Sequence, residues 1–127
     1  MWYCVHALHY FKYIDGTQTE FLVWEHMYLI NAASTSEAKR KGELRAKEDE
    51  GDSGASLMLN NRPARLEFIT VRKVVQCQDL DEQLRMPTDG TELSYSEYLV
   101  SNQDDFEKLT NAETATVSYL GNDDDRE

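Results

Sequence analysis

Long apolar stretches are missing from this sequence. No run approaches the roughly 20 residues that a membrane-spanning helix needs. The first residues also lack the basic and then apolar arrangement of a signal peptide. We therefore expect neither a membrane partner nor export, and we predict a cytoplasmic location.

Cysteine is scarce: there are only Cys4 and Cys77, and each lies in an apolar stretch that reads as a strand. Without an export signal, two such residues are typical of buried, reduced thiols. A disulfide between adjacent strands is the less favoured alternative.

Basic side chains are scarce in the second half of the chain. Residues 1–77 carry ten acidic and ten basic side chains, whereas residues 78–127 carry fourteen acidic and three basic, which accounts for the whole net charge of −11. A field of this sign repels nucleic acid and anionic membranes and speeds the encounter with a basic protein. The charge therefore argues against a nucleic-acid partner and for a basic protein partner. The alternative is an acidic surface that serves only solubility.

What is present indicates one soluble domain. The chain of 127 residues is 40% hydrophobic and 29% charged, which suits a single domain with a single core. We place this domain at residues 1–120. The last residues, 121–127, read GNDDDRE and are too charged and too short to pack, so we expect a disordered tail.

Two long strands, residues 2–13 and 19–31, open the chain. Both are rich in aromatic and β-branched residues, and Asp15-Gly16 between them is a strong hairpin signal. Neither strand has a polar face, although a hairpin with one face in water alternates apolar with polar residues. We therefore predict cover on both faces, from a helix on one side and, as a homodimer contact, from a second subunit on the other.

A helix is predicted next, at about residues 35–50, with Ser34 or Ser36 as its cap. Its small residues repeat every four positions and would let it lie close to a sheet. They are Ala38, Gly42 and Ala46.

The rest of the chain adds strands at residues 64–77 and 91–97 and a short helix capped by Asn102 or Asp104. Residues 114–120 could form an edge strand. The predicted order is ββαββα, and the class is α+β, with an antiparallel sheet of about four strands that carries a helix on one face.

The stretches WYCVHAL, SEAKRKGE, LEFITVRKV and DGTELSYSEYL together carry a resemblance to a known family. The chain resembles, over roughly residues 2–100, a family of small bacterial proteins known only as a domain of unknown function. Members typically begin with a Trp-Tyr strand and carry a Gly-Thr-Glu segment near the end. The resemblance implies a compact α+β unit of bacterial type, and it implies no established activity and no catalytic residue.

The metal-ligand candidates are Cys4, His6, His9 and His26. If the hairpin loop has three residues, 15–17, His6 falls directly opposite His26, while Cys4 shares the strand face of His6. A zinc site needs three or four convergent ligands, so another would have to come from Cys77 or a carboxylate. Histidines packed among aromatic residues are the commoner case, and we predict no metal or other cofactor.

No catalytic set is apparent. The GDSG segment at residues 51–54 matches the nucleophile segment of trypsin-like proteases, but the chain is about half the necessary length and lacks supporting His and Asp segments. Glu92 and Glu97 are an odd number of residues apart and would point to opposite faces of a strand. Asp89-Gly90 is explained by a turn. We therefore predict no catalytic residue and favour a protein that is not an enzyme.

Two functional hypotheses remain. The first is a non-enzymatic protein-binding module of the immunity or antitoxin type, which meets a basic partner through its acidic C-terminal half. Its predicted contact residues are Glu92, Tyr95, Glu97, Tyr98, Asp104 and Asp105. The second is a small homodimeric domain that binds a ligand or metal, with or without enzymatic activity. Its predicted pocket lies near His6, His26 and Tyr95.

Overall fold

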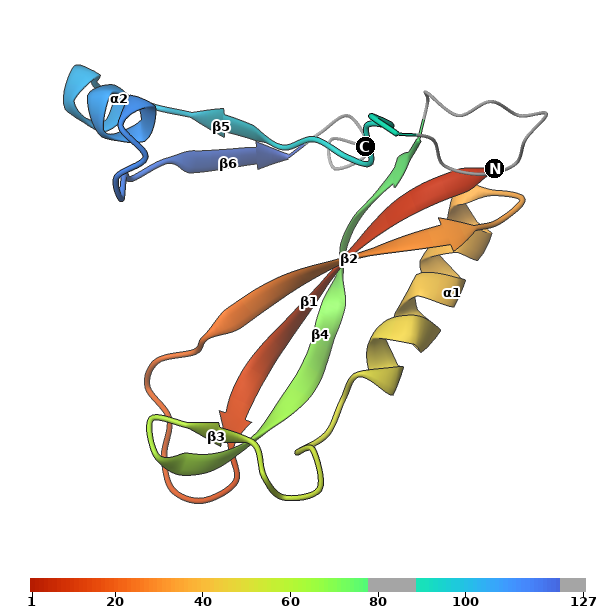
Figure 1. The fold of residues 1–127 in the computed structure, drawn as a ribbon, viewed down its shortest axis with the longest axis vertical. Coiled ribbons are helices and arrows are strands. Elements are labelled where there is room, and N and C mark those ends of the chain that lie inside the picture. The colour runs from red at the N-terminus through yellow and green to blue at the C-terminus, as the bar shows by residue number, and fades with distance from the viewer. Residues whose placement is uncertain (78–88, 122–127) are drawn as a thin grey trace. The chain divides into compact units, whose positions relative to one another are not determined.

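The computed structural model describes residues 1–77 and 89–121 and has the predicted α+β class (Figure 1). The order of elements approximates the predicted ββαββα, with the short strands β3 and β6 in addition. In chain order the elements are β1 (Trp2–Tyr13), β2 (Val23–Asn31), α1 (Thr35–Glu48), β3 (Met58–Leu59), β4 (Arg62–Gln76), β5 (Glu97–Leu99), α2 (Gln103–Thr110) and β6 (Ser118–Gly121).

Contacts divide the chain into two compact units, Met1–Leu93 and Ser94–Glu127. The first unit contains β1 to β4 and α1, and the second contains β5, α2 and β6. The single domain predicted for residues 1–120 stays a prediction. The predicted tail lies outside the described residues, except for Gly121, which ends β6.

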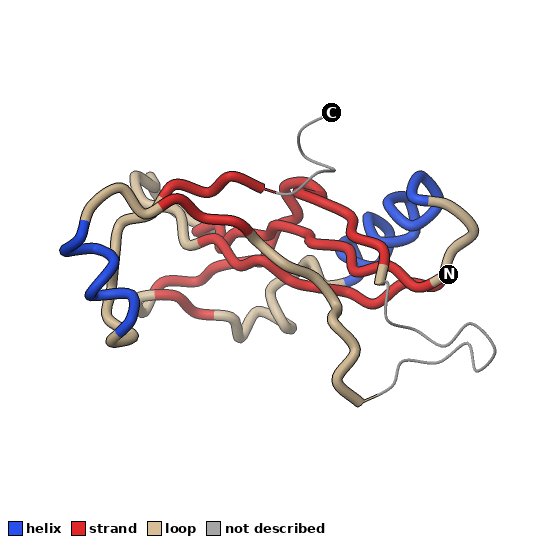
Figure 2. The backbone as a smooth tube through the Cα atoms, turned by 90° about the horizontal axis from the view of Figure 1, so that it is seen from above, coloured by secondary structure: helices blue, strands red, loops and turns tan. Residues whose placement is uncertain are grey.

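The first unit is an antiparallel sheet with the strand order β2-β1-β4-β3, so that β1 runs through its middle. Helix α1 lies along one face of this sheet and contacts β1, β2 and β4. The path of the backbone through these strands and the helix can be followed in Figure 2.

Helix α1 begins as predicted, because the Ser34 hydroxyl accepts a hydrogen bond from the Glu37 backbone N–H at 3.2 Å. The small-residue stripe of Ala38, Gly42 and Ala46 is confirmed as the buried face of the helix. At its centre the helix touches β1: a Cβ atom added to Gly42 would lie 2.5 Å from Cγ1 of Val5. Only glycine permits so close an approach.

The core under α1 consists mostly of short side chains. Its buried members are Tyr3, Val5, Ala32, Ala38 and Val74, with Ile30 and Val71 packed against them. Cover of this face by a helix is therefore confirmed. On the opposite face the side chains of Cys4, His6 and Lys73 are also buried.

The hairpin does not have the three-residue loop that would place His6 opposite His26. Ala7 pairs with His26 and His6 pairs with Met27, and the last pair of the ladder is Tyr10 with Val23. The connection is wide because the side chain of Gln18 takes the place of a strand partner. Its Nε2 donates to the Phe11 carbonyl at 2.8 Å, and its Oε1 accepts from the Tyr13 N–H at 3.3 Å.

Strand β4 carries two irregularities in its pairing with β1. The register shifts between His6 and Ala7 and again between Leu8 and His9, which leaves Arg72 and Ile69 as the extra residues of β4. Such bulges bend a strand and change which face its side chains occupy.

Strand β3, which was not predicted, forms a tight hairpin with β4. Leu59 pairs with Arg62, and the two residues between them, Asn60 and Asn61, have φ angles of 53° and 62°. Asparagine tolerates this left-handed conformation, which two-residue hairpin turns require.

The second unit is a two-stranded antiparallel sheet, β5 with β6, joined through α2. Asn102 caps α2 as predicted, because its side chain accepts from the Asp105 N–H at 2.8 Å. The strand predicted at residues 91–97 is wrong, since β5 begins only at Glu97. No helix within the described ranges is long and apolar enough to cross a membrane.

Candidate functional site

Five of the six predicted contact residues lie in the second unit: Tyr95, Glu97, Tyr98, Asp104 and Asp105. Glu92 belongs to the first unit, where it follows the turn at Asp89-Gly90. That turn is confirmed by the positive φ of Gly90, 85°.

The second unit exposes apolar side chains. None of residues 94–120 is buried, although the stretch contains a sheet and a helix. Tyr98 and Tyr119 lie directly opposite each other, with ring centroids 5.9 Å apart, and both remain at least 40% exposed. The other exposed apolar side chains of the unit are Tyr95, Leu99, Phe106, Leu109 and Leu120. Among the apolar side chains of this unit, Tyr98 and Tyr119 form a ring contact that stays open to solvent.

The sequence of the second unit is rich in carboxylates. Residues 94–121 contain five acidic side chains and a single basic one, Lys108, which gives a net charge of −4. The acidic residues are Glu97, Asp104, Asp105, Glu107 and Glu113. An apolar surface among charges of one sign is suited to a partner of the opposite sign.

Asp105 connects two segments of the second unit through its carboxylate. Its carboxylate accepts hydrogen bonds from Nδ2 of Asn102 at 2.9 Å and from the Thr116 N–H at 3.4 Å. The bonds from Asn102 and Thr116 lower the pKa of Asp105. The side chain thereby ties the start of α2 to the segment before β6.

His6 belongs to an ion network on the face of the sheet away from α1. Its Nδ1 lies 3.0 Å from Oε2 of Glu25, which also binds the guanidinium of Arg72. Burial lowers the pKa of His6 and outweighs the opposing effect of Glu25. Burial alone would raise the pKa of Glu25, but hydrogen bonds from Arg72 and His6 outweigh it and lower that pKa. His6 is thus already occupied by a carboxylate.

His26 lies on the other face, beneath α1, and its partner is His9. Nε2 of His9 lies 2.8 Å from the carbonyl oxygen of Ala46 and must donate to it, so Nδ1 of His9 accepts from Nδ1–H of His26 at 2.8 Å. Burial, and then the proximity of His9, lower the pKa of His26. The sequence analysis missed this pair. The observed register would have revealed it, because it makes His9 and His26 diagonal neighbours on one face.

Tyr28 and Asp49 fasten the end of α1 to β2. The Tyr28 hydroxyl donates to Oδ2 of Asp49, whose Oδ1 accepts from Arg45 at 2.9 Å. Hydrogen bonds from Tyr28 and Arg45 lower the pKa of Asp49. Burial, together with Asp49, raises the pKa of Tyr28, so the phenol stays protonated and acts as a donor. This cluster therefore has a structural role.

Of the four metal candidates, the structure brings His9 and His26 together but keeps both apart from Cys4 and His6. Cys4 and His6 face away from α1, whereas His26 faces it, so the predicted pocket near His6, His26 and Tyr95 is wrong in its placement of the two histidines. Within residues 1–77 and 89–121, no group of three His, Cys, Asp or Glu side chains is arranged to hold a metal ion.

Both cysteines are buried thiols, as predicted. Burial raises the pKa of Cys4 to about 11 and also raises that of Cys77. Cys77 lies 3.7 Å, from Sγ to oxygen, from the carbonyl of Leu93. At neutral pH such thiols are protonated and poor nucleophiles.

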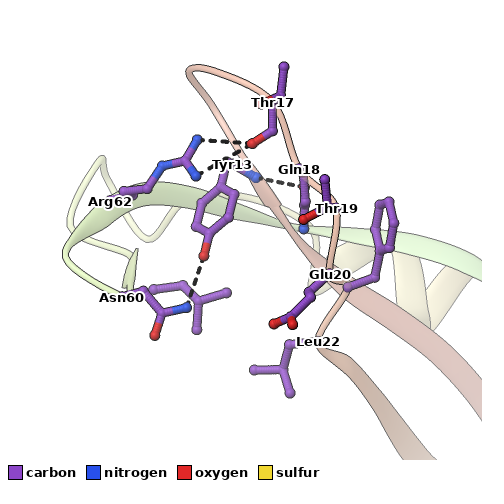
Figure 3. Close-up of a pocket in the computed structure, with 10 residues that line it drawn as sticks. Tyr13, Thr17, Gln18, Thr19, Glu20, Leu22, Asn60 and Arg62 are labelled. Atoms are coloured by element: carbon purple, nitrogen blue, oxygen red, sulfur yellow. Dashed lines mark hydrogen bonds between the residues drawn. The ribbon is translucent and has the colours of Figure 1, made fainter.

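A pocket of about 510 Å³ lies between the β1–β2 loop and the β3–β4 turn (Figure 3). Arg62 stacks on the Tyr13 ring, 3.6 Å from guanidinium carbon to ring centroid, and donates to the carbonyls of Asp15 and Thr17. Nδ2 of Asn60 donates to the Tyr13 hydroxyl at 2.9 Å. These polar groups bind one another, and their contacts fasten the β1–β2 loop to the β3–β4 turn.

The class of protein that these features define is a small α+β protein with an open, acidic second unit and without a converged catalytic or metal-binding set among the described residues. The comparison with family models agrees with this class. Residues 2–94 match the model of the domain of unknown function DUF4288, so the chain belongs to this family. Neither the curated proteins nor the solved structures gave a match.

Proposed function

We propose that this protein is a non-enzymatic binding module whose second unit engages a basic protein partner, in the manner of an immunity or antitoxin protein. The observation that carries the proposal is the composition of that unit's surface. Residues 94–120 bury no side chain, expose seven large apolar ones and have a net charge of −4. A folded segment gains little by exposing so much apolar surface unless another molecule covers it.

In this proposal the aromatic side chains and the carboxylates of the second unit have different roles. Tyr98, Tyr119 and Phe106 provide large, half-exposed rings, and aromatic residues are the usual anchors of protein interfaces. The carboxylates around them accelerate the encounter with a positively charged surface and select against acidic partners. A toxin that binds nucleic acid would present such a basic surface.

The homodimeric state is also part of the proposal. The first unit carries the N-terminal hairpin, and residues 1–77 are balanced at ten acidic and ten basic side chains. Two copies can therefore meet there without the charge repulsion that their acidic units would cause.

The experiment compares two variants with the same change of charge. Asp104→Lys with Glu113→Lys changes two exposed carboxylates of the second unit, and Glu43→Lys with Glu48→Lys changes a half-buried and an exposed carboxylate of α1. Each protein is immobilised and used to capture partners from its native cells, and the captured proteins are identified by mass spectrometry. We expect a basic protein that the wild type and the α1 variant retain and that the second-unit variant loses.

The proposal fails if the two variants retain the same proteins, or if the protein that depends on the second unit is acidic. Circular dichroism of both variants, recorded beforehand, establishes that a loss of capture reflects the surface and not the fold.

A further inference from the structure

Strand β2 is an open edge of the main sheet. Its ladder partner is β1, and no other strand in the described parts of the chain pairs with it. Its nine residues pair with β1 in one continuous register, without a bulge. A regular edge strand presents a row of N–H and C=O groups to which another strand can bind.

The hydrogen bonds at both ends of this ladder show which residues face outward. The Phe11 N–H donates to the carbonyl of Leu22, and the Ala32 N–H donates to the carbonyl of Met1. Because the bonding alternates in an antiparallel pair, the even-numbered residues of β2 bind β1. The backbone groups of the odd-numbered residues, from Val23 to Asn31, therefore point to the open edge.

The side chains of β2 are apolar and exposed on both faces of the sheet. Val23, Trp24 and Met27 are 45%, 51% and 60% exposed. The strand carries a single charge, Glu25, and Arg72 and His6 already bind it. An added strand would cover apolar groups without burying an unpaired charge.

Strand β4, on the other side of β1, has features that protect the edge of a sheet from added strands. Two bulges, at Arg72 and Ile69, interrupt the register of β4 with β1, and Arg72 and Lys73 add charge within the strand. Its first residues are paired with β3. Bulges, charged side chains and a short covering strand are the usual protections of an edge. In the described parts of the chain β2 has neither a bulge nor a covering strand, and its one charged side chain, Glu25, is bound by Arg72 and His6.

We propose that the edge of β2 binds the same edge of a second copy of this chain, antiparallel, about a two-fold axis at Met27. Charge selects this occupant: the first 77 residues have no net charge, so a second copy is not repelled here and a basic protein is not attracted. The inference deepens the proposed homodimeric state by naming its contact.

This register uses the whole strand, because Met27 is the middle residue of Val23–Asn31. Met27 pairs with Met27 of the second copy and Glu25 with Leu29 of the second copy, which gives about six backbone hydrogen bonds between outward-facing groups. No two like charges face each other. The two four-stranded sheets join into one continuous sheet with both α1 helices on the same face.

The first test is the mass in solution. Sedimentation equilibrium should give twice the 14.7 kDa of one chain for the wild type. Met27→Lys places a charge at the centre of the edge and should give the mass of one chain, whereas Leu44→Lys, a matched change at an exposed leucine of α1, should leave the dimer. A monomeric wild type, or a Met27→Lys variant that remains dimeric, would overturn the proposal.

The second test addresses the register. The Cα atoms of a hydrogen-bonded antiparallel pair lie about 5.5 Å apart, which is within the Cα range of disulfides. Met27→Cys should therefore form a disulfide between two chains on mild oxidation, while Val23→Cys, whose counterpart lies far along the strand, should not. The opposite pattern contradicts the axis at Met27.

The two proposals can fail separately. A monomeric Met27→Lys protein should still capture the basic partner, because its second unit is unchanged. The Asp104→Lys, Glu113→Lys protein should lose the partner and remain a dimer.

Discussion

At the scale of single residues, Gly42 sets how closely α1 approaches the sheet. Alanine is the better helix former by about 1 kcal/mol, but its Cβ would lie 2.5 Å from Cγ1 of the fully buried Val5. Overpacking of a core costs about 1–3 kcal/mol. We therefore expect Gly42→Ala to lower the free energy of unfolding, by as much as about 2 kcal/mol, in urea titrations.

A double-mutant cycle checks this cause. Val5→Ala makes room for the new methyl group, so Gly42→Ala introduced into a Val5→Ala background should cost little or should stabilise the protein. If the cost of Gly42→Ala is the same in both backgrounds, the close contact with Val5 does not determine it.

The histidines give the protein a dependence on pH. The pKa values of His6 and His26 are lowered in the folded state, below the ordinary value of 6.5, so the unfolded chain binds more protons as the pH falls below 6.5. The free energy of unfolding must then decrease in that range. Thermal melts should show a lower melting temperature at pH 5.5 than at pH 7.5.

His26→Asn tests the share of one histidine. The asparagine amide still offers a donor to Nδ1 of His9 but does not titrate. The decrease in melting temperature between pH 7.5 and 5.5 should become smaller, without vanishing, because His6 remains. An unchanged decrease would show that His26 does not contribute.

At the scale of elements, Asp105 connects α2 with the segment that leads into β6. It accepts from Nδ2 of Asn102 and from the Thr116 N–H, so Asp105→Ala should free both donors. We expect hydrogen exchange at Thr116 and within α2 to become at least several-fold faster, with no change in β1. Asp104→Ala, one residue away and without these contacts, is the control, and equal effects of both changes would argue against the connection.

Most elements of the fold could be predicted from local signals. The Ser34 cap and the stripe of Ala38, Gly42 and Ala46 depend on residues close in sequence, and so does the Asn102 cap. The hairpin register could not be predicted, because the side chain of Gln18 replaces a backbone partner and widens the loop. That register differs by one residue from the one that would place His6 opposite His26, so the two histidines lie on opposite faces of the sheet.

The candidate contact surface was only partly predictable for a related reason. Charge and aromatic content pointed to the second unit. The hydrogen bond from the Thr116 N–H to Asp105, however, joins residues eleven positions apart, so the sequence did not show that this carboxylate already has a partner within the unit. Likewise, the Tyr28, Asp49 and Arg45 cluster joins β2 to α1 over about twenty residues and gives no local signal.

At the scale of the whole molecule, the two units differ in charge. Residues 1–77 carry no net charge and include an open, apolar edge strand, whereas residues 94–121 carry a net charge of −4 and exposed aromatic rings. In the proposals above, the neutral part joins two copies and the acidic part meets another protein. A dimer would then present two acidic units to its partners and gain avidity from both.

The central claim is that the acidic second unit binds a basic partner, and calorimetric titration of the purified partner tests it most directly. For the wild type we expect binding that weakens by at least tenfold when the salt concentration rises from 50 to 500 mM, because the Debye screening length falls from about 14 Å to about 4 Å over that range. The Asp104→Lys, Glu113→Lys variant should bind at least tenfold more weakly at low salt, and the Glu43→Lys, Glu48→Lys variant should bind as the wild type does. Binding that is equal in all three proteins and independent of salt would contradict the account.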